Sequence, residues 1–247
     1  SHPIQRREAG PPEHDQQDFP TFCEETMSDS LKSQYLLDPN VIFLNHGSLG
    51  ACPRPVFESY QQWQRELERQ PLEFMRRSPA LLAEARARLG AYLNVPPEDI
   101  VYFTNPTTAL NMVARSLDLQ PGDEILTTDH EYPAMNNTWN FIAHKTGARY
   151  VQRSIPLPVT SVADFVEAFW AGVTERTKII FISHITSPTA LIFPVSEICR
   201  RAHEAGLISI VDGAHAPSQI PLDLREVGAD IYACLLYTSP SPRDRTR

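Results

Sequence analysis

Two side chains with catalytic potential, Asp212 and His215, follow a short apolar run within the segment 208–216. In an open α/β sheet, ligands bind where the strands end at their carboxyl termini, so we expect both side chains to point into a cleft. A single Asp at a strand end can also serve only to cap the following helix. The segment therefore indicates a binding site only if other strand ends carry matching chemistry.

A second expected strand ends at Thr104, and Thr107 and Thr108 begin the helix that follows. The first N–H groups of a helix lack partners within it, and the helix dipole is positive there, so this end can hold a phosphate. The chain has neither a GxGxxG nor a Walker A pattern, which disfavours dinucleotides and nucleoside triphosphates. The alternative is simple N-capping by Thr107.

Two more strands are expected to end in polar residues, near Tyr132 and His184. Tyr132 could cover one face of a planar ligand, or it could be a half-buried surface tyrosine. His184 lies beside several hydroxyl residues, where a histidine is either a ligand contact or a structural residue. Because every such strand end is polar, we favour one cleft with a phosphate site, an aromatic cover, a carboxylate and two imidazoles.

Pyridoxal 5'-phosphate (PLP) is the cofactor that fits this set of groups. Its phosphate needs a helix N-terminus, its flat ring needs a stacking partner, and its phenolic oxygen needs a donor. Its pyridine nitrogen needs a carboxylate, because the protonated ring is the electron sink for carbanions at an amino-acid α-carbon. The sequence therefore predicts a PLP site.

Strands that alternate with helices must position these groups. The pattern predicts strands at 100–104, 124–128, 149–153, 178–183 and 207–211. It predicts helices at 107–117, 133–145, 161–172 and 195–205. Such crossovers favour an α/β fold with a mostly parallel, doubly wound sheet. Two further helices are expected between 53 and 95, the first from Pro53 or Pro55 and the second after Ser78-Pro79.

Several motifs together resemble the class V aminotransferase-like enzymes of PLP fold type I. They are 43–53, Thr107-Thr108, 130–132, 183–189, 211–216 and 228–230. The resemblance covers about residues 30–233 and is nearest to the isopenicillin N epimerase-like branch, with cysteine desulfurases more distant. It implies the large domain of that fold, with helices flanking the sheet, an epimerase- or aminotransferase-like enzyme acting at the α-carbon of an amino acid and, by analogy, a homodimer.

The resemblance also implies roles for the residues that contact the cofactor. Thr107 and Thr108 would hold the phosphate, and Tyr132 would stack on the pyridine ring where desulfurases use a histidine. Asp212 would pair with the ring nitrogen and His215 would hydrogen-bond near the phenolic oxygen, so these two are the candidate catalytic residues.

Further positions are assigned in the same way. His184 falls where relatives place a residue that contacts the oxygen side of the ring. Asn45, His46 and Gly47 would lie at the mouth through which the substrate enters.

One part of the family pattern is missing. In this family Gly-Ala-Asp-x-Tyr is soon followed by Gly-Asn-x-His-Lys, whose lysine forms the Schiff base with the cofactor, whereas Thr238 lies near that place here. Lys32, Lys145 and Lys178 are the only lysines, and none matches the motif. The lysine is also the general base for the α-proton, a role typically worth about 10²–10⁴-fold in rate. We therefore expect an active parent enzyme and an inactive fragment that also lacks the small C-terminal domain.

The two ends of the chain differ from the rest. Residues 1–26 are polar and aperiodic, so they are expected to be disordered or to be upstream sequence translated ahead of Met27. Residues 27–52 are expected to contribute to the substrate mouth, and 53–233 to form a partial PLP-binding large domain. The stretch 234–247 resembles the in-frame translation of a transposon-end adapter from a sequencing library, with an ordinary Ser/Pro-rich tail as the alternative.

Composition and spacing exclude several classes of function. The net charge of −8 and the lack of a basic stripe argue against nucleic-acid binding. No apolar run approaches the roughly 18 residues needed to cross a membrane. Neither His130 and Glu131 nor the four scattered cysteines have metal-ligand spacing. We expect a soluble cytoplasmic protein that acts on a small amino-acid substrate.

Two alternatives stay open. The first is a cysteine desulfurase or C–S lyase, which would need a mobile cysteine, and Tyr132 in place of histidine argues slightly against it. The second is a non-catalytic domain that binds a PLP-like ligand and has lost its lysine. The native sequence after Ala233 separates the last reading from the others, because a His-Lys pair there would indicate an enzyme.

Overall fold

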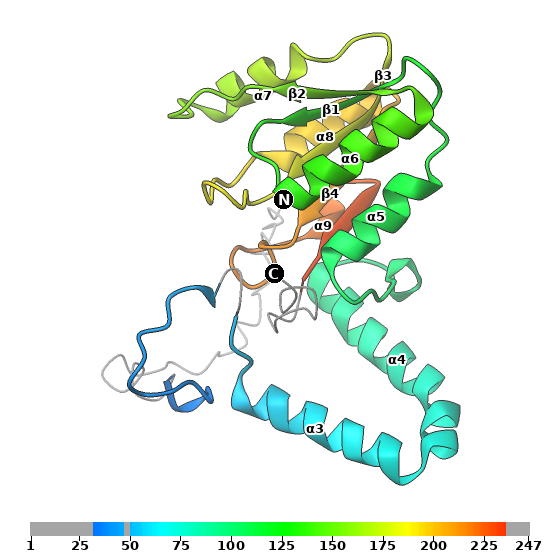
Figure 1. Cartoon of the computed structure of the whole chain (residues 1–247), viewed down its shortest axis with the longest axis vertical. Helices are drawn as coiled ribbons and strands as arrows, with labels where there is room; N and C mark the ends of the chain where they lie inside the picture. Colours follow the sequence, from blue (N-terminus) through cyan, green and yellow to red (C-terminus); the bar gives the residue numbers. More distant parts are fainter. Residues whose placement is uncertain (1–31, 47–49, 236–247) are drawn as a thin grey trace, which may run out of the picture.

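A computed structural model of the chain describes residues 32–46 and 50–235. At its centre lies a five-stranded sheet in which all neighbouring strands are parallel (Figure 1). The strand order is β2-β1-β3-β4-β5. The strands are β1 (Glu124–Thr128), β2 (Arg149–Arg153), β3 (Thr177–Ser183), β4 (Ile208–Gly213) and β5 (Ile231–Cys234).

Helices cover both faces of this sheet, which confirms the predicted α/β class. They are α5 (Pro106–Ser116), α6 (Pro133–Thr146), α7 (Val162–Trp170), α8 (Val195–Glu204) and α9 (Leu224–Val227). On one face α5 and α6 pack around Trp139, which is fully buried and contacts the Phe181 ring. On the other face α7, α8 and α9 enclose a second core that contains Phe165 and Phe169.

The central strand β3 shows why the sheet is buried on both sides. Apart from Lys178, all its residues are buried, and β-branched side chains suit a strand between two helical layers. Alternate residues face opposite layers, so Ile180 and Ile182 belong to the core under α7 and α8. Ile179 and Phe181 belong to the core under α5 and α6. This alternation also decides which face a side chain takes at the strand end.

Two predictions about the sheet are wrong. The segment 100–104 is not a strand: residues 101–103 are exposed, and no described strand pairs with them. An apolar run becomes a strand only if a neighbour completes its hydrogen-bond ladder, and sequence periodicity does not report the neighbour. The sequence analysis also omitted β5, which lies beside β4 and packs Ala233 into the core under α5.

Two helices precede the sheet, as expected, but one starts earlier than predicted. They are α3 (Arg54–Arg69) and α4 (Pro71–Leu93), followed by a short 3-10 turn at Pro97–Asp99. Pro71 begins α4 because a proline in the first turn needs no N–H partner. Pro79, predicted to begin a helix, instead lies inside α4, where it removes one backbone donor.

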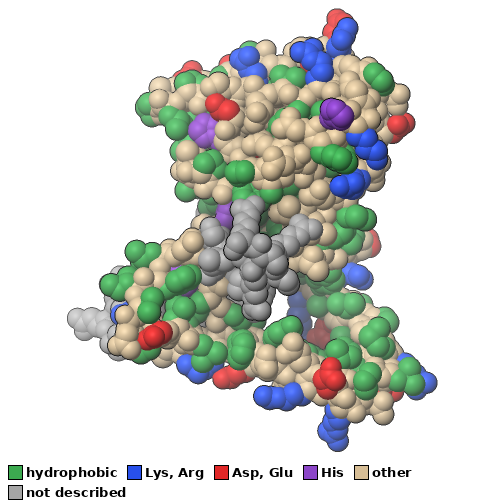
Figure 2. Space-filling model, in the orientation of Figure 1, with side chains coloured by type: hydrophobic (Ala, Val, Ile, Leu, Met, Phe, Trp, Pro, Cys, Tyr) green, Lys and Arg blue, Asp and Glu red, His purple; other side chains and the backbone are tan. Residues whose placement is uncertain are grey.

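The pair formed by α3 and α4 extends away from the sheet (Figure 1). No residue of α3 is buried, although it carries Val56, Tyr60 and Trp63 at helical spacing. Apolar side chains reach the surface in this lower part of the molecule (Figure 2). Within the described residues, no helix is both long and apolar enough to span a membrane.

Candidate functional site

The ends of β3 and β4 bring Ser183 and Asp212 side by side at the carboxyl edge of the sheet. The two residues are partners in the β3/β4 register. Each lies two positions after a member of the core under α5 and α6, namely Phe181 and Ile210. Because side chains alternate along a strand, Ser183 and Asp212 both lie on the face that α5 and α6 cover.

The starts of α5 and α6 lie on this face too. Asn105 caps α5 by accepting a hydrogen bond from the Thr108 N–H (2.8 Å), so Thr107 is not the cap. The Thr138 hydroxyl in the second turn of α6 donates to Asn111 Oδ1 in the second turn of α5 (3.2 Å), which holds the two helix starts together. The half-buried Thr107 and Thr108 thus stand at the positive end of α5, where a phosphate can bind.

Asp212 is a buried carboxylate with few partners. It is 7% exposed, and its Oδ1 accepts a hydrogen bond from the Ala214 N–H (3.1 Å). No basic side chain in the described part of the chain forms an ion pair with it. Burial raises the pKa of Asp212 to about 6, because desolvation disfavours the charged form. A cationic ring nitrogen here would keep the carboxylate ionised and would be held by it.

Tyr132 lies between the end of β1 and the start of α6. It is half-buried, packs against the core under α5 and α6, and its carbonyl accepts the Met135 N–H (2.9 Å) in the first turn of α6. Its position on the same face as Asp212 and the start of α5 suits an aromatic cover for a planar ring. The structure therefore brings Thr107, Thr108, Tyr132 and Asp212 to one edge of the sheet.

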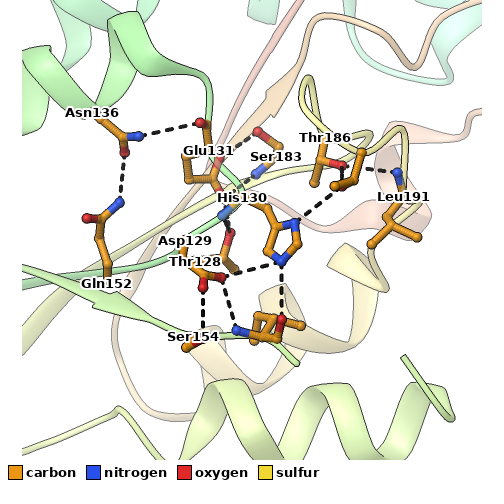
Figure 3. Close-up of polar contacts among 12 residues, drawn as sticks. Thr128, Asp129, His130, Glu131, Asn136, Gln152, Ser154, Ser183, Thr186 and Leu191 are labelled. Atoms are coloured by element: carbon orange, nitrogen blue, oxygen red, sulfur yellow. Dashed lines mark hydrogen bonds and ion pairs between the residues drawn. The ribbon is translucent and has the colours of Figure 1, made fainter. Parts of the chain in front are cut away.

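Glu131, which the sequence analysis considered only as a metal ligand, is a second buried carboxyl at this edge. Its Oε1 accepts hydrogen bonds from the Thr128 hydroxyl (2.7 Å) and the Ser183 N–H (3.3 Å), and its Oε2 is paired with the Ser183 hydroxyl (2.5 Å) (Figure 3). Burial, and to a smaller extent the charge of Asp212, raises the pKa of Glu131 to about 7.

His184 contacts Asp212 through its backbone, whereas its side chain contacts Tyr232, which packs against the opposite core, under α7 and α8. Its N–H donates to the Asp212 carbonyl (2.9 Å), and its Nδ1 lies 2.8 Å from the Tyr232 hydroxyl. Burial lowers the pKa of His184, which favours the neutral ring. A neutral ring that accepts the Tyr232 O–H at Nδ1 carries its proton on Nε2 and can donate from there. Gly213 makes room for this contact, since a Cβ there would lie 2.1 Å from the Tyr232 ring.

His130 lies on the opposite face of the sheet, beside Ile155 and Phe193, and its ring contacts the neighbouring loops. Its Nδ1 lies 3.3 Å from the Thr189 hydroxyl, and its Nε2 lies 3.2 Å from the Ile155 carbonyl and 3.4 Å from the Asp129 carboxylate (Figure 3). The ring also meets the Phe193 ring edge-on. These contacts give His130 a structural role that ties together the loops after β1, β2 and β3.

The other residues predicted for the site have fewer contacts with the carboxyl edge of the sheet. His215 lies in the turn after β4, half-buried, and burial lowers its pKa. Asn45 and His46 are exposed, and the contacts of His46 are with Ala51 (3.5 Å) and with neighbouring aromatic rings in its own segment. The structure therefore does not bring this pair to the sheet edge. Gly47 lies outside the described residues.

Sequence analysis missed Glu131, Ser183 and Tyr232 as residues of this edge. A weak signal exists for Ser183, because it ends the apolar run 179–182. Tyr232 gave no signal, since its segment was not predicted as a strand.

The donor set at this edge fits PLP. The start of α5 suits the phosphate, and Tyr132 suits one face of the ring. Asp212 has no basic partner among the described residues, and the protonated ring nitrogen would supply one.

Comparisons with known proteins agree with this assignment. The aminotransferase class-V family model matches residues 53–234. The chain is 38% identical over 203 residues to the isopenicillin N epimerase of Streptomyces clavuligerus, an alignment that covers 82% of this chain and 51% of that protein. It is 40% identical over 208 residues to the isopenicillin N epimerase of Amycolatopsis lactamdurans, with 82% and 52% covered. The chain thus spans about half the length of the curated relatives it matches.

Solved structures of C-DES, a cystine C–S lyase, share the fold. One is a lysine-to-alanine variant with glycine covalently linked to its PLP cofactor, with a TM-score of 0.76 and 26% identity over 82% of this chain and 54% of that chain. Another is its complex with cysteine persulfide, with a TM-score of 0.72, 28% identity and 79% and 53% covered. The chain therefore belongs to the class-V aminotransferase family of PLP-dependent proteins with fold type I.

Proposed function

We propose that the parent protein is a PLP-dependent enzyme that acts at the α-carbon of an amino acid, with epimerase- or aminotransferase-like chemistry. The observation that carries this proposal is the buried Asp212, which has no basic partner in the described part of the chain and lies on the sheet face shared with Tyr132 and the start of α5. The similarity to two isopenicillin N epimerases supports the epimerase-like reading.

Each residue would have a distinct task. Thr107 and Thr108 would bind the phosphate, Tyr132 would orient the ring by stacking, and Asp212 would hold the proton on the ring nitrogen. PLP with a protonated ring acts as the electron sink for charge that develops at the α-carbon. His184 would donate from Nε2 toward the phenolic oxygen, and His215, half-buried beside Asp212, would assist there.

We also propose that the chain as printed is inactive. Lys32 is an exposed residue of the N-terminal segment, Lys145 lies in the last turn of α6, and Lys178 is exposed near the start of β3. The last two positions are at or near the opposite edge of the sheet from Asp212. None of these amines is therefore available to form the covalent link to the cofactor or to move the α-proton.

A PLP-binding measurement tests the assignment of the site. The 247-residue chain is titrated with PLP and, separately, with pyridoxal, which lacks the phosphate, and binding is followed by the absorbance of the ring and by quenching of tryptophan fluorescence. We expect saturable binding of PLP and at least 10-fold weaker binding of pyridoxal, because the start of α5 would contribute roughly 1.5–3 kcal/mol per charge-assisted hydrogen bond. Equal affinities would contradict the phosphate site.

Turnover separates the inactive chain from its parent. The PLP-loaded chain is incubated with α-deuterated amino acids, and loss of deuterium or formation of a keto acid is measured by mass spectrometry. We expect neither, whereas the full-length product of the same gene should show α-proton exchange. Exchange by the printed chain would contradict the proposed inactivity.

A cysteine desulfurase or C–S lyase is the second candidate, supported by the likeness to the C–S lyase C-DES. Release of sulfide or persulfide from L-cysteine or L-cystine by the full-length protein would favour it over epimerisation. PLP binding without any α-proton exchange by the full-length protein would instead favour the non-catalytic binding domain.

The homodimer and the cytoplasmic location expected from the sequence stay predictions. The exposed Val56, Tyr60 and Trp63 of α3 form an apolar surface that a second subunit could cover. Sedimentation of the full-length protein at micromolar concentration tests the dimer directly.

A further inference from the structure

Glu131 is held on two sides, and both contacts fix the residue that follows it. Its side chain reaches across the sheet to Ser183 at the end of β3 and back to Thr128 at the end of β1. Its carbonyl accepts a hydrogen bond from Asn136 Nδ2 (3.4 Å) in the first turn of α6. The peptide that leads into Tyr132 is therefore anchored to β1, β3 and α6 together.

The anchor extends to β2 as well. Asn136 Oδ1 accepts a hydrogen bond from Gln152 Nε2 (3.1 Å) (Figure 3). It also accepts one from the Tyr150 hydroxyl (2.6 Å). This fixes the amide of Asn136 in the orientation that donates to the Glu131 carbonyl. Side chains from three adjacent strands thus hold the Glu131–Tyr132 junction, directly or through Asn136. A helix start does not need this many side-chain hydrogen bonds.

The carboxyl of Glu131 is an expensive group to bury without a cation. It is 3% exposed, and no Lys or Arg of the described residues contacts it. Hydroxyl and N–H donors offset part of its desolvation, but an apolar residue of similar size would avoid that cost altogether. The cost of burying Glu131 is explained if its hydrogen bonds hold the following residue, Tyr132, in a position that the site needs.

We propose that Glu131 is a positioning residue of the cofactor site: by tying the end of β3, through Ser183, to the end of β1 it fixes Tyr132 over the ring. This inference rests on the proposed function, since it assigns Tyr132 the place of the ring's stacking partner. Glu131 itself acts through Tyr132, not by contact with the cofactor.

Glutamine at this position separates geometry from charge. In Glu131→Gln, Oε1 can still accept from Thr128 and Ser183, and Nε2 can donate to the Ser183 hydroxyl, so all three contacts are retained. In Glu131→Ala, all three are lost. A positioning role therefore predicts that the glutamine variant binds PLP as tightly as the unsubstituted chain does. The alanine variant should bind PLP more weakly.

Glu124, the first residue of β1, offers a matched control at the opposite edge of the sheet. Glu124 is also buried and also paired, with Arg149 Nη1 (3.0 Å) and with the Thr174 hydroxyl (2.6 Å). It lies at the amino edge of the sheet, far from Tyr132 in the register. Both Glu124→Ala and Glu131→Ala should reduce stability through their lost contacts, but Glu124→Ala should leave the cofactor site unchanged.

The experiment measures PLP affinity and the circular dichroism that the bound ring acquires, in the full 247-residue chain. A lysine-to-alanine variant of C-DES holds PLP with glycine attached. PLP binding can therefore be measured in a chain that lacks the linking lysine. We expect at least 10-fold weaker binding and a reduced or inverted induced band for Glu131→Ala. Glu131→Gln should stay within 3-fold, and Glu124→Ala should leave affinity and band unchanged.

A double-mutant cycle with Tyr132→Ala gives the readout that a merely structural role would not move. If Glu131 acts through Tyr132, then Glu131→Ala should cost little further affinity once Tyr132→Ala is present. Additive losses, or unchanged affinity in Glu131→Ala, would overturn the inference while leaving the proposed function intact. No PLP binding by the unsubstituted chain would contradict the proposed function and this inference together.

Should Glu131→Ala fail to fold, Ser183→Ala decides the question. It removes one donor to Oε2 and leaves the Ser183 N–H in place. We then expect a 3- to 10-fold loss of PLP affinity that disappears in the Tyr132→Ala background, and a loss that persists there would overturn the inference.

Discussion

Glu124 begins β1 and Glu131 lies in the loop that follows it, and both carboxyls are buried, yet their surroundings differ. Glu124 lies at the amino edge of the sheet, where Arg149 and Thr174 pair with its two oxygens. Glu131 lies at the carboxyl edge with hydroxyl and N–H donors, and the charge of the buried Asp212 adds to the rise in its pKa. At the amino edge Arg149 pairs with the buried acid, whereas the two acids at the carboxyl edge have no Lys or Arg partner among the described residues.

The different partners of the two carboxyls indicate different roles for the two edges of the sheet. Pairing a buried carboxylate with a guanidinium recovers part of its desolvation cost, so the amino edge needs nothing from outside. The carboxyl edge keeps an uncompensated electrostatic cost that a cationic ligand would relieve. Perturbed ionisable groups of this kind gather at functional sites, and each prediction below tests whether the two edges differ in this way.

The largest expected effect is on the pH dependence of stability in Glu131→Gln. The pKa of Glu131 is raised from 4.5 to about 7 in the folded state, so the folded chain binds the proton more tightly than the unfolded chain. Stability from this group is therefore present at low pH and is lost as pH rises from about 4.5 to 7. Glutamine does not titrate, so the variant should be more stable by on the order of 3 kcal/mol at pH 8.

Urea unfolding of the two proteins between pH 5 and pH 8 measures this difference, and the curves should converge toward pH 5. The neutral His184 and His215, whose pKa values are lowered by burial, act in the opposite direction below about pH 6.5 in both proteins and cancel in the comparison. A glutamine variant that is less stable at pH 8 would show that the ionised carboxylate is stabilising.

Asp212→Asn should separate stability from binding. With a folded pKa of about 6 instead of 3.8, the carboxyl destabilises the ligand-free chain above that range, so the variant should unfold at higher urea at pH 8. Its PLP affinity should fall about 10- to 100-fold, because a hydrogen bond to a charged group is lost at the ring nitrogen. If Asp212→Asn lowered both the unfolding free energy and the PLP affinity, the role of Asp212 would be to stabilise the fold.

Gly213→Ala should disturb the link from β5 to His184. The added Cβ would lie 2.1 Å from the Tyr232 ring, which must shift away from His184. Overpacking of this kind costs about 1–3 kcal/mol in unfolding free energy. The nitrogen shifts of the His184 ring, measured by NMR, should also change as Nδ1 loses its partner, whereas Gly206→Ala, with open space around it, should leave them unchanged.

The smallest expected effect belongs to the amino edge. Glu124→Gln keeps the shape but removes the charge that faces the largely exposed Arg149, so it should cost no more than about 1 kcal/mol of stability. Its PLP affinity should equal that of the unsubstituted chain. A loss of PLP affinity in this variant would abolish the distinction between the two edges.

Sequence patterns predicted the strands at 124–128 and 149–153 with the bounds that the structure has, because the turn at 121–123 precedes the first strand and helix-length segments separate the two. The same patterns failed at 100–104, where no neighbouring strand is described, and at α4, where a proline inside the helix was taken for its start. Strand ends at Asp212 and His184 were found because polar residues follow apolar runs abruptly.

The sequence by itself determined the parallel α/β class, the polar strand ends and the family pattern, since periodicity and residue order are local properties of the chain. Only the tertiary structure decided which of these ends share a face and which carboxyls lack a cation. Glu124 and Glu131 are the same residue type at the two ends of one strand segment, and residue type alone does not reveal their partners. Arg149 reaches one and Ser183 the other because parallel strands distant in sequence meet in a fixed register, and the free energy of a buried charge depends on those neighbours.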